Sequence, residues 1–249
     1  MRLTMRAARV GGAFELIVTN ALVLNGSITA NGTAGIGQNS GGGSGGSVWL
    51  TVGTLSGSGL ATANGGAGDL PNGGGGDGGR IALYGSTNQF AGSFAAHGGA
   101  GTNYGGAGTV YLQTQAAKSS APHSVLTIDN GGWGGTNTPL TSLASAYDLT
   151  VAGGAQAVVT VQTTYSSPLL LGTLLITSNS WLICTNVSQT YLSLSNNATI
   201  QAGGGILLDG CGSPGGAGSG AGHSATGPNG VVAGSGGGWE TNRYWHVSR

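Results

Sequence analysis

The chain has 249 residues, of which 54 are glycine, and its seven Lys or Arg and seven Asp or Glu balance to a net charge of zero. Charge this sparse excludes a basic nucleic-acid surface and a polybasic membrane anchor. No apolar stretch is long enough to span a membrane. Helices are disfavoured as well, because their solvated faces need Lys, Glu and Arg and because glycine is a poor helix former.

Composition divides the chain into four predicted segments. They are an N-terminal lead-in or first coil (1–21), glycine-rich repeats (22–113), compact coils (114–202) and a glycine-rich segment with an aromatic C-terminal cap (203–249). The lead-in places three arginines before an apolar stretch at 13–18, but Glu15 interrupts that stretch. It is therefore not a clear signal peptide.

A repeat of about 33 residues runs through the first half of the chain. Asn31, Asn64 and His97 follow one another at this interval, each near the end of a short apolar run. A second run follows each glycine-rich stretch, at 47–52, 80–84 and 109–113. Ankyrin repeats share the period, but the helix formers that they need are missing.

Alternation within these second runs predicts strands with one apolar face. Val48 and Leu50 point to one side and Trp49 to the other. The residues predicted to be buried are Val48, Leu50, Ile81, Leu83, Val110 and Leu112. One unit cannot bury its apolar edge alone, so the repeats are expected to stack as a solenoid. The glycine-rich stretches are predicted to pack through backbone hydrogen bonds in a polyproline-II-like manner.

The glycine-rich runs at 41–50 and 73–83 resemble repeats of large secreted and cell-surface β-solenoid proteins. More widely, the chain resembles the right-handed parallel β-helix proteins, which include bacterial adhesins, phage tail proteins and pectate-lyase-like enzymes. Asn31 and Asn64 are similar to the stacked asparagine ladders of such helices, and His97 breaks the ladder. The resemblance implies an all-β, single-domain parallel β-helix with glycine-rich loops stacked on one flank.

Carboxylates are the first candidates for chemistry, because glycosidases and lyases depend on them. Asp69, Asp77 and Arg80 lie in one repeat. A pectate-lyase-like site resembles this group in type, with acids that hold Ca²⁺ and an arginine that acts as base. If the chain is an enzyme, a glycoside hydrolase or polysaccharide lyase, these three are its predicted catalytic residues. The alternative is that both aspartates are solvated and accept hydrogen bonds from turn amides.

No cofactor is predicted from the sequence. The glycine-rich stretches that end at Asp69 and Asp77 are similar to calcium-binding nonapeptide repeats, but they lack the spacing and the tandem recurrence of those repeats. Structural Ca²⁺ is kept as an alternative. The four histidines, at 97, 123, 223 and 246, lack partners at metal-ligand spacing and are predicted to be surface or turn residues.

Aromatic residues recur on the polar side of the second strands. Trp49, Tyr84 and Tyr111 are predicted to share this face with Arg80 and Gln113. Adjacent strands are about 4.8 Å apart, so these side chains can form a flat strip on which sugar rings stack while Arg and Gln bind hydroxyls. The alternative is that a glycine-rich loop covers the aromatic rings as a second small core.

Two cysteines, Cys184 and Cys211, lie 27 residues apart, close to one coil. Stacked positions fall within the Cα separation of a disulfide, so these residues are a candidate pair. Two buried free thiols are the alternative.

Together these patterns predict an extracellular or cell-surface module that contacts polysaccharide or a surface glycan, or that acts as an adhesive scaffold. Two alternatives stay open, namely a polysaccharide-degrading enzyme and a purely structural filament or spacer. The expected partners include neither nucleic acid nor a membrane. A longer repeat protein, or an end-to-end assembly, is a further expectation for solenoid units.

Overall fold

The computed structural model describes residues 8–37, 39–115, 122–141, 143, 145–161, 163–185, 190–212, 225–227 and 230–232. Every regular element in this part of the chain is a β-strand, which confirms the predicted all-β class. The described residues accordingly include no helix that is long and apolar enough to cross a membrane. The predicted aromatic cap near 239–246, with His223 and His246, lies outside the described residues.

The strands follow the short apolar runs of the sequence. They are β1 (Ala13–Val23), β2 (Ser27–Thr29), β3 (Ser47–Gly57), β4 (Leu60–Thr62), β5 (Arg80–Phe90), β6 (Ser93–Ala95), β7 (Thr109–Gln115), β8 (Pro122–Asp129), β9 (Asn137–Leu140), β10 (Tyr147–Ala152), β11 (Gln156–Val159), β12 (Leu169–Ile176), β13 (Trp181–Cys184), β14 (Leu192–Leu194), β15 (Ala198–Ile200), β16 (Gly205–Leu207), β17 (Ala225–Gly227) and β18 (Gly230–Val232).

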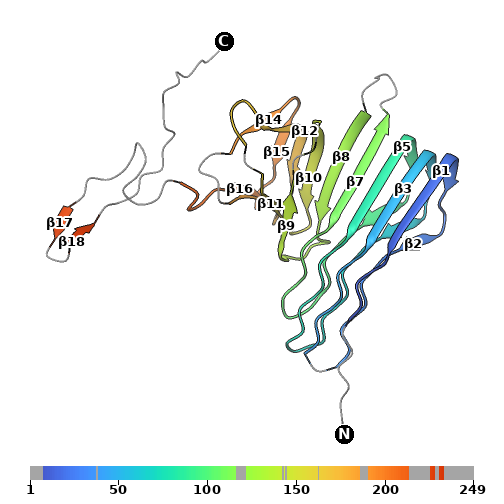
Figure 1. Ribbon diagram of the computed structural model, residues 1–249, viewed down its shortest axis with the longest axis horizontal. Coiled ribbons are helices and arrows are strands. Elements are labelled where there is room, and N and C mark those ends of the chain that lie inside the picture. The colour runs from blue at the N-terminus through green and yellow to red at the C-terminus, as the bar shows by residue number, and fades with distance from the viewer. Residues whose placement is uncertain are drawn as a thin grey trace, which may run out of the picture.

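One large sheet runs through the described structure, in the order β1-β3-β5-β7-β8-β10-β12-β14, with β15 also paired to β12 (Figure 1). Two smaller sheets accompany it, β2-β4-β6 beside the first half and β16-β13-β11-β9 beside the second. Nearly all neighbours are parallel; the antiparallel pairs are β7 with β8 and the separate hairpin of β17 and β18. The fold is therefore a set of mostly parallel sheets.

The repeat length in the sequence sets the register in which the strands of the first half pair. Ser47 pairs with Arg80 between β3 and β5, and Leu60 pairs with Ser93 between β4 and β6, so each residue meets the one 33 positions later. Between β5 and β7 the shift is 29, since Arg80 pairs with Thr109. Equivalent positions of successive repeats thus share a face, and their apolar residues form one continuous core.

The first core confirms the predicted burial pattern with one exception. Val48, Leu50, Ile81 and Leu83 are at most 1% exposed, and Val110 is also buried. Leu112 is only partly buried, although it packs against the same core. Leu112 lies on β7, the last strand of the first half, and the first core ends beside this strand.

The two halves of the large sheet bury opposite faces. Across the antiparallel junction Tyr111 pairs with Leu126 and Leu112 pairs with Val125. Residues directly opposite each other share a face of the sheet. Leu126 belongs to the second core, whereas Leu112 packs against the first. The core therefore changes sides where β7 meets β8.

Each small sheet covers one of these cores. The sheet β2-β4-β6 covers the first core through Ile28 and Phe94. The sheet of β9, β11, β13 and β16 covers the second through Leu140, Ala157 and Leu182. Because the cores face opposite ways, the second small sheet rises beside the uncovered face of β3, β5 and β7.

The glycine-rich stretches form three stacked loops, 30–46, 63–79 and 96–108, that extend beyond the ends of the strands (Figure 1). They are joined by backbone hydrogen bonds, as predicted. Gly65 donates to the carbonyl of His97 in the next loop, and Gly66 donates to Gly43 in the preceding one. A Cβ atom on Gly75 would lie 1.8 Å from the carbonyl oxygen of Gly99, so only glycine permits this approach.

Candidate functional site

The predicted aromatic face lies on β3, β5 and β7, on the side away from the first core. The register sets Trp49 level with Ala82 and Tyr111, and Tyr84 level with Thr51 and Gln113. Alternation turns these side chains outward because their neighbours in the chain point into the core. Five of the predicted site residues, including Arg80 at the start of β5, thus share one face.

The three aromatic rings form a continuous strip across these strands. The rings of Trp49 and Tyr84 stack with centroids 4.9 Å apart and an interplanar angle of 23°. Those of Tyr84 and Tyr111 are 5.7 Å apart and tilted by 56°. Trp49 is 45% exposed, while Tyr84 and Tyr111 are half-buried. The strip is open at Trp49 and better covered toward Tyr111, where the second core begins.

A groove of about 980 Å³ has this strip as its floor. The strip residues line it together with Asp77 and Arg80, and residues Asn137–Leu140 of β9 also line it. β9 is the edge strand of its sheet, and its position beside the strip follows from the change of core at β7 and β8. The groove therefore lies in the corner between the uncovered sheet face and β9.

Hydrogen bonds hold Tyr111, which lies at the end of the strip nearest the second core. The Tyr111 hydroxyl donates to Ser124 Oγ at 3.0 Å, and Gln113 Nε2 donates to the same Tyr111 oxygen at 3.1 Å. Gln113 thus orients Tyr111. Burial, with a smaller contribution from Tyr111, raises the pKa of Tyr84. A tyrosine hydroxyl is protonated at neutral pH in any case, so Tyr84 can donate a hydrogen bond.

The predicted acidic residues occupy different places in the second glycine-rich loop. Asp77 lies at its base, where its Oδ1 accepts hydrogen bonds from Gly106 N at 2.7 Å and Thr136 Oγ1 at 2.8 Å. Asp69 lies at its tip, where its carbonyl accepts from Gly73 N.

The structure thus brings Asp77 and Arg80 to the groove but leaves Asp69 at the loop tip. The bonds to Asp77 match the alternative that it satisfies backbone and hydroxyl donors. The catalytic assignment of the three residues stays a prediction. Within the described residues no group of three or more His, Cys, Asp or Glu side chains gathers as a metal site.

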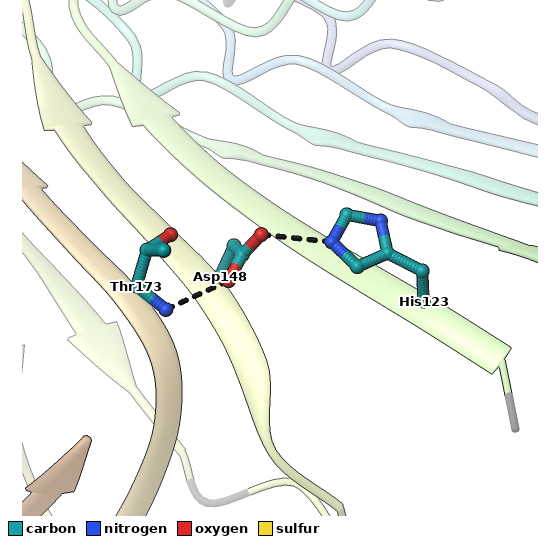
Figure 2. A network of polar contacts seen from close by, with 3 residues as sticks. All are labelled: His123, Asp148 and Thr173. Atoms are coloured by element: carbon teal, nitrogen blue, oxygen red, sulfur yellow. Dashed lines mark hydrogen bonds and ion pairs between the residues drawn. The ribbon is translucent and has the colours of Figure 1, made fainter. Parts of the chain in front are cut away.

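A second polar group, absent from the sequence predictions, lies on β8, β10 and β12 (Figure 2). His123 Nε2 lies 2.8 Å from Asp148 Oδ2, and Asp148 Oδ1 accepts a hydrogen bond from Thr173 N at 2.7 Å. The register of β10 with β12 shifts between Tyr147 and Leu149, so an irregularity faces Asp148. The carboxylate thereby satisfies an amide at this irregularity.

No local signal marks this contact in the sequence. His123 and Asp148 lie 25 residues apart, and only the pairing of β8 with β10 brings them together. Burial raises the pKa of Asp148, but hydrogen bonds from Thr173 and His123 and the charge of His123 outweigh it, so the pKa lies below its ordinary value.

We expect Asp148 to make the stability of the fold depend on pH. Because its pKa is lower in the folded than in the unfolded chain, its ionised form stabilises the fold above about pH 4, and this contribution is lost as the pH falls through the folded pKa. Asp148→Asn should therefore lower the free energy of unfolding near neutral pH and have a smaller effect in strong acid. Urea unfolding at both pH values measures this difference.

Asp209→Asn is the matched control, because Asp209 is exposed. It should change stability little at either pH. An equal loss for Asp148→Asn in acid and at neutral pH would show that the carboxylate charge is not the cause.

The two cysteines lie next to each other as free thiols. Cys211 Sγ donates to the carbonyl oxygen of Cys184 at 2.7 Å. Cys211 lies in the turn that follows β16, where its amide donates a hydrogen bond to Leu208 O at 3.2 Å. Their proximity was predicted, and the disulfide stays a prediction.

Comparison of the chain with protein-family models, with curated proteins and with solved structures finds no match.

Proposed function

We propose that the chain is a secreted or cell-surface β-solenoid module that binds polysaccharide in the groove above the aromatic strip. The observation that carries the proposal is the run of Trp49, Tyr84 and Tyr111 along the floor of an open groove. Large exposed apolar patches are uncommon on folded proteins unless they have a role.

The register supports the proposed solenoid. Parallel pairing at a shift of 33 residues, or 34 before the irregularity in β1, stacks β1 on β3 on β5, and β2 on β4 on β6, in the same order. Each turn of chain then contacts only its neighbours, as in a solenoid. The change of direction at β7 and β8 divides the proposed solenoid into two stacks of coils.

A sugar chain suits the groove better than an extended peptide. Pyranose rings stack on exposed aromatic rings such as that of Trp49, and Arg80 and Asn137 line the same groove and can bind hydroxyls. A peptide would be expected to pair with the free edge of β9. Pro139 removes a backbone N–H from that edge strand, which disfavours strand addition.

Removal of the strip should abolish binding and leave the fold intact. Trp49→Ala combined with Tyr84→Ala should weaken polysaccharide binding on the order of a hundredfold or more, since each stacking contact contributes roughly 1–3 kcal/mol. The melting temperature should change little, because Trp49 is 45% exposed. Affinity electrophoresis in β-glucan, xylan and polygalacturonate gels measures the binding.

Tyr165→Ala is the control, because Tyr165 is 75% exposed and lies outside the groove. It should retain wild-type binding. If the wild-type protein is retained by none of the polysaccharides, the proposal fails. A loss of about 3–5 kcal/mol of stability in each single variant would instead mark the rings as buried structure.

A structural scaffold is the second candidate, favoured by the outer edge of β1. Phe14 is 45% exposed, although it pairs with Val48, which is 1% exposed. Ile17 on the same strand is 69% exposed. A further coil stacked on β1 would cover the apolar end of the first core. Concentration-dependent association of a protein that binds no glycan would favour this function over polysaccharide binding.

A further inference from the structure

A second aromatic pair lies outside the groove, in a region that the sequence analysis did not single out. The rings of Tyr104 and Trp133 stack with centroids 4.7 Å apart and an interplanar angle of 7°. Tyr104 comes from the third glycine-rich loop, and Trp133 from the connection between β8 and β9. Tyr104 covers one face of the Trp133 ring, yet Trp133 remains 51% exposed, so part of its ring is open to solvent.

Buried hydrogen bonds hold this surface in place. Asn130 is fully buried, and its Nδ2 donates to Trp133 O at 2.7 Å and to Gly105 O at 3.0 Å. Its Oδ1 accepts from Gly98 N at 2.8 Å. One side chain thus ties the turn that carries Trp133 to the loop that carries Tyr104. A ring fixed before binding loses little conformational entropy when a ligand stacks on it.

Two chain segments connect the Tyr104–Trp133 pair to the groove. Thr136, three residues after Trp133, donates to Asp77, which lines the groove. Tyr104 lies seven residues before Tyr111 on one extended stretch, which limits the separation of their Cα atoms to about 25 Å. The surface near Tyr104 is polar, since Thr102, Asn103 and Thr136 are exposed.

We propose that Tyr104 and Trp133 form a second subsite for the same polysaccharide, which a chain enters after it leaves the groove. The inference rests on the proposed function, because the ligand is the one bound by the aromatic strip. The subsite takes sugar rings rather than apolar side chains, since the residues next to the two rings in the chain are glycines and exposed polar residues. Two linked contacts raise affinity only for ligands long enough to reach both.

The experiment measures binding against chain length. Oligosaccharides of increasing length, prepared from the polysaccharide that the wild-type protein retains, are titrated by calorimetry. The wild-type affinity should rise steeply once the chain spans both sites. Trp133→Ala should remove this gain, a loss of about tenfold to a hundredfold for long chains, and leave short chains unaffected. Trp133→Phe should restore most of the gain.

Three results would overturn the inference. These are equal losses for short and long chains, no loss for either, and unfolding of Trp133→Ala as seen by circular dichroism. The strip variant Trp49→Ala with Tyr84→Ala should lose binding at every length, which separates the two sites. If the wild-type protein binds no polysaccharide, the proposed function fails and the subsite fails with it, whereas a loss of length dependence alone leaves the groove in place.

Discussion

Replacing Gly75 with alanine should prevent the glycine-rich loops from stacking and should strongly destabilise the first half. A Cβ atom at this position would lie 1.8 Å from Gly99 O, which belongs to the backbone of the next loop. Relief requires the loops to separate, which breaks bonds such as that of Gly75 N to Asn103 O. We expect a loss of at least about 3 kcal/mol, a large part of a typical stability of 5–15 kcal/mol.

Thermal unfolding followed by circular dichroism measures this effect, and the melting temperature should fall by roughly 10 °C. Gly134→Ala is the matched control, because a Cβ atom there would have no heavy atom within 4 Å. It should be neutral or stabilise the fold by up to about 1 kcal/mol, since alanine restricts the unfolded chain more than glycine does. Equal effects of the two substitutions would contradict the stacked arrangement of the loops.

The loss of Asn130 should have the next largest effect. In Asn130→Ala the amide of Gly98 and the carbonyls of Gly105 and Trp133 lose their side-chain partner. Buried polar groups without partners cost about 1–3 kcal/mol each, so we expect a loss of about 3–5 kcal/mol. Urea unfolding gives the value, and fluorescence of Trp133 should report a more solvated ring.

Asn196→Ala is the control for this substitution, because Asn196 is an exposed turn residue. It should change the free energy of unfolding by less than about 0.5 kcal/mol. A similarly small change for Asn130→Ala would show that the connection between β8 and β9 is held by other contacts.

Local pattern determined the strands and the faces of the first half. Alternation predicted the burial of Val48 and Leu83 and the outward position of Trp49, because a strand has a side-chain period of two. The repeat predicted which residues stack. Asn64 N donates to Asn31 Oδ1 at 2.7 Å, and His97 N donates to Asn64 Oδ1 at 2.8 Å, one repeat apart in each case.

The sites that depend on chain direction were not predictable in this way. Asn130 accepts a hydrogen bond from Gly98, and Asp148 meets His123, only because β8 runs antiparallel to β7 and parallel to β10. Asp69 and Asp77 lie in one repeat of the sequence, and the loop places one residue at its tip and the other at its base. Sequence distance does not give separation in space when an extended loop intervenes.

The sequence by itself determined the all-β class, the 33-residue register and the aromatic face, since all three follow from periodic side chains on stacked strands. Only the tertiary structure decided what borders that face. The reversal between β7 and β8 moves the core to the opposite side of the sheet, so that Leu126 is buried on the face that carries Tyr111. β9 is thereby placed beside the strip, and a flat face becomes the floor of a groove. No local sequence pattern indicates the reversal between β7 and β8, because an alternation of apolar and polar residues is compatible with either direction of the strand.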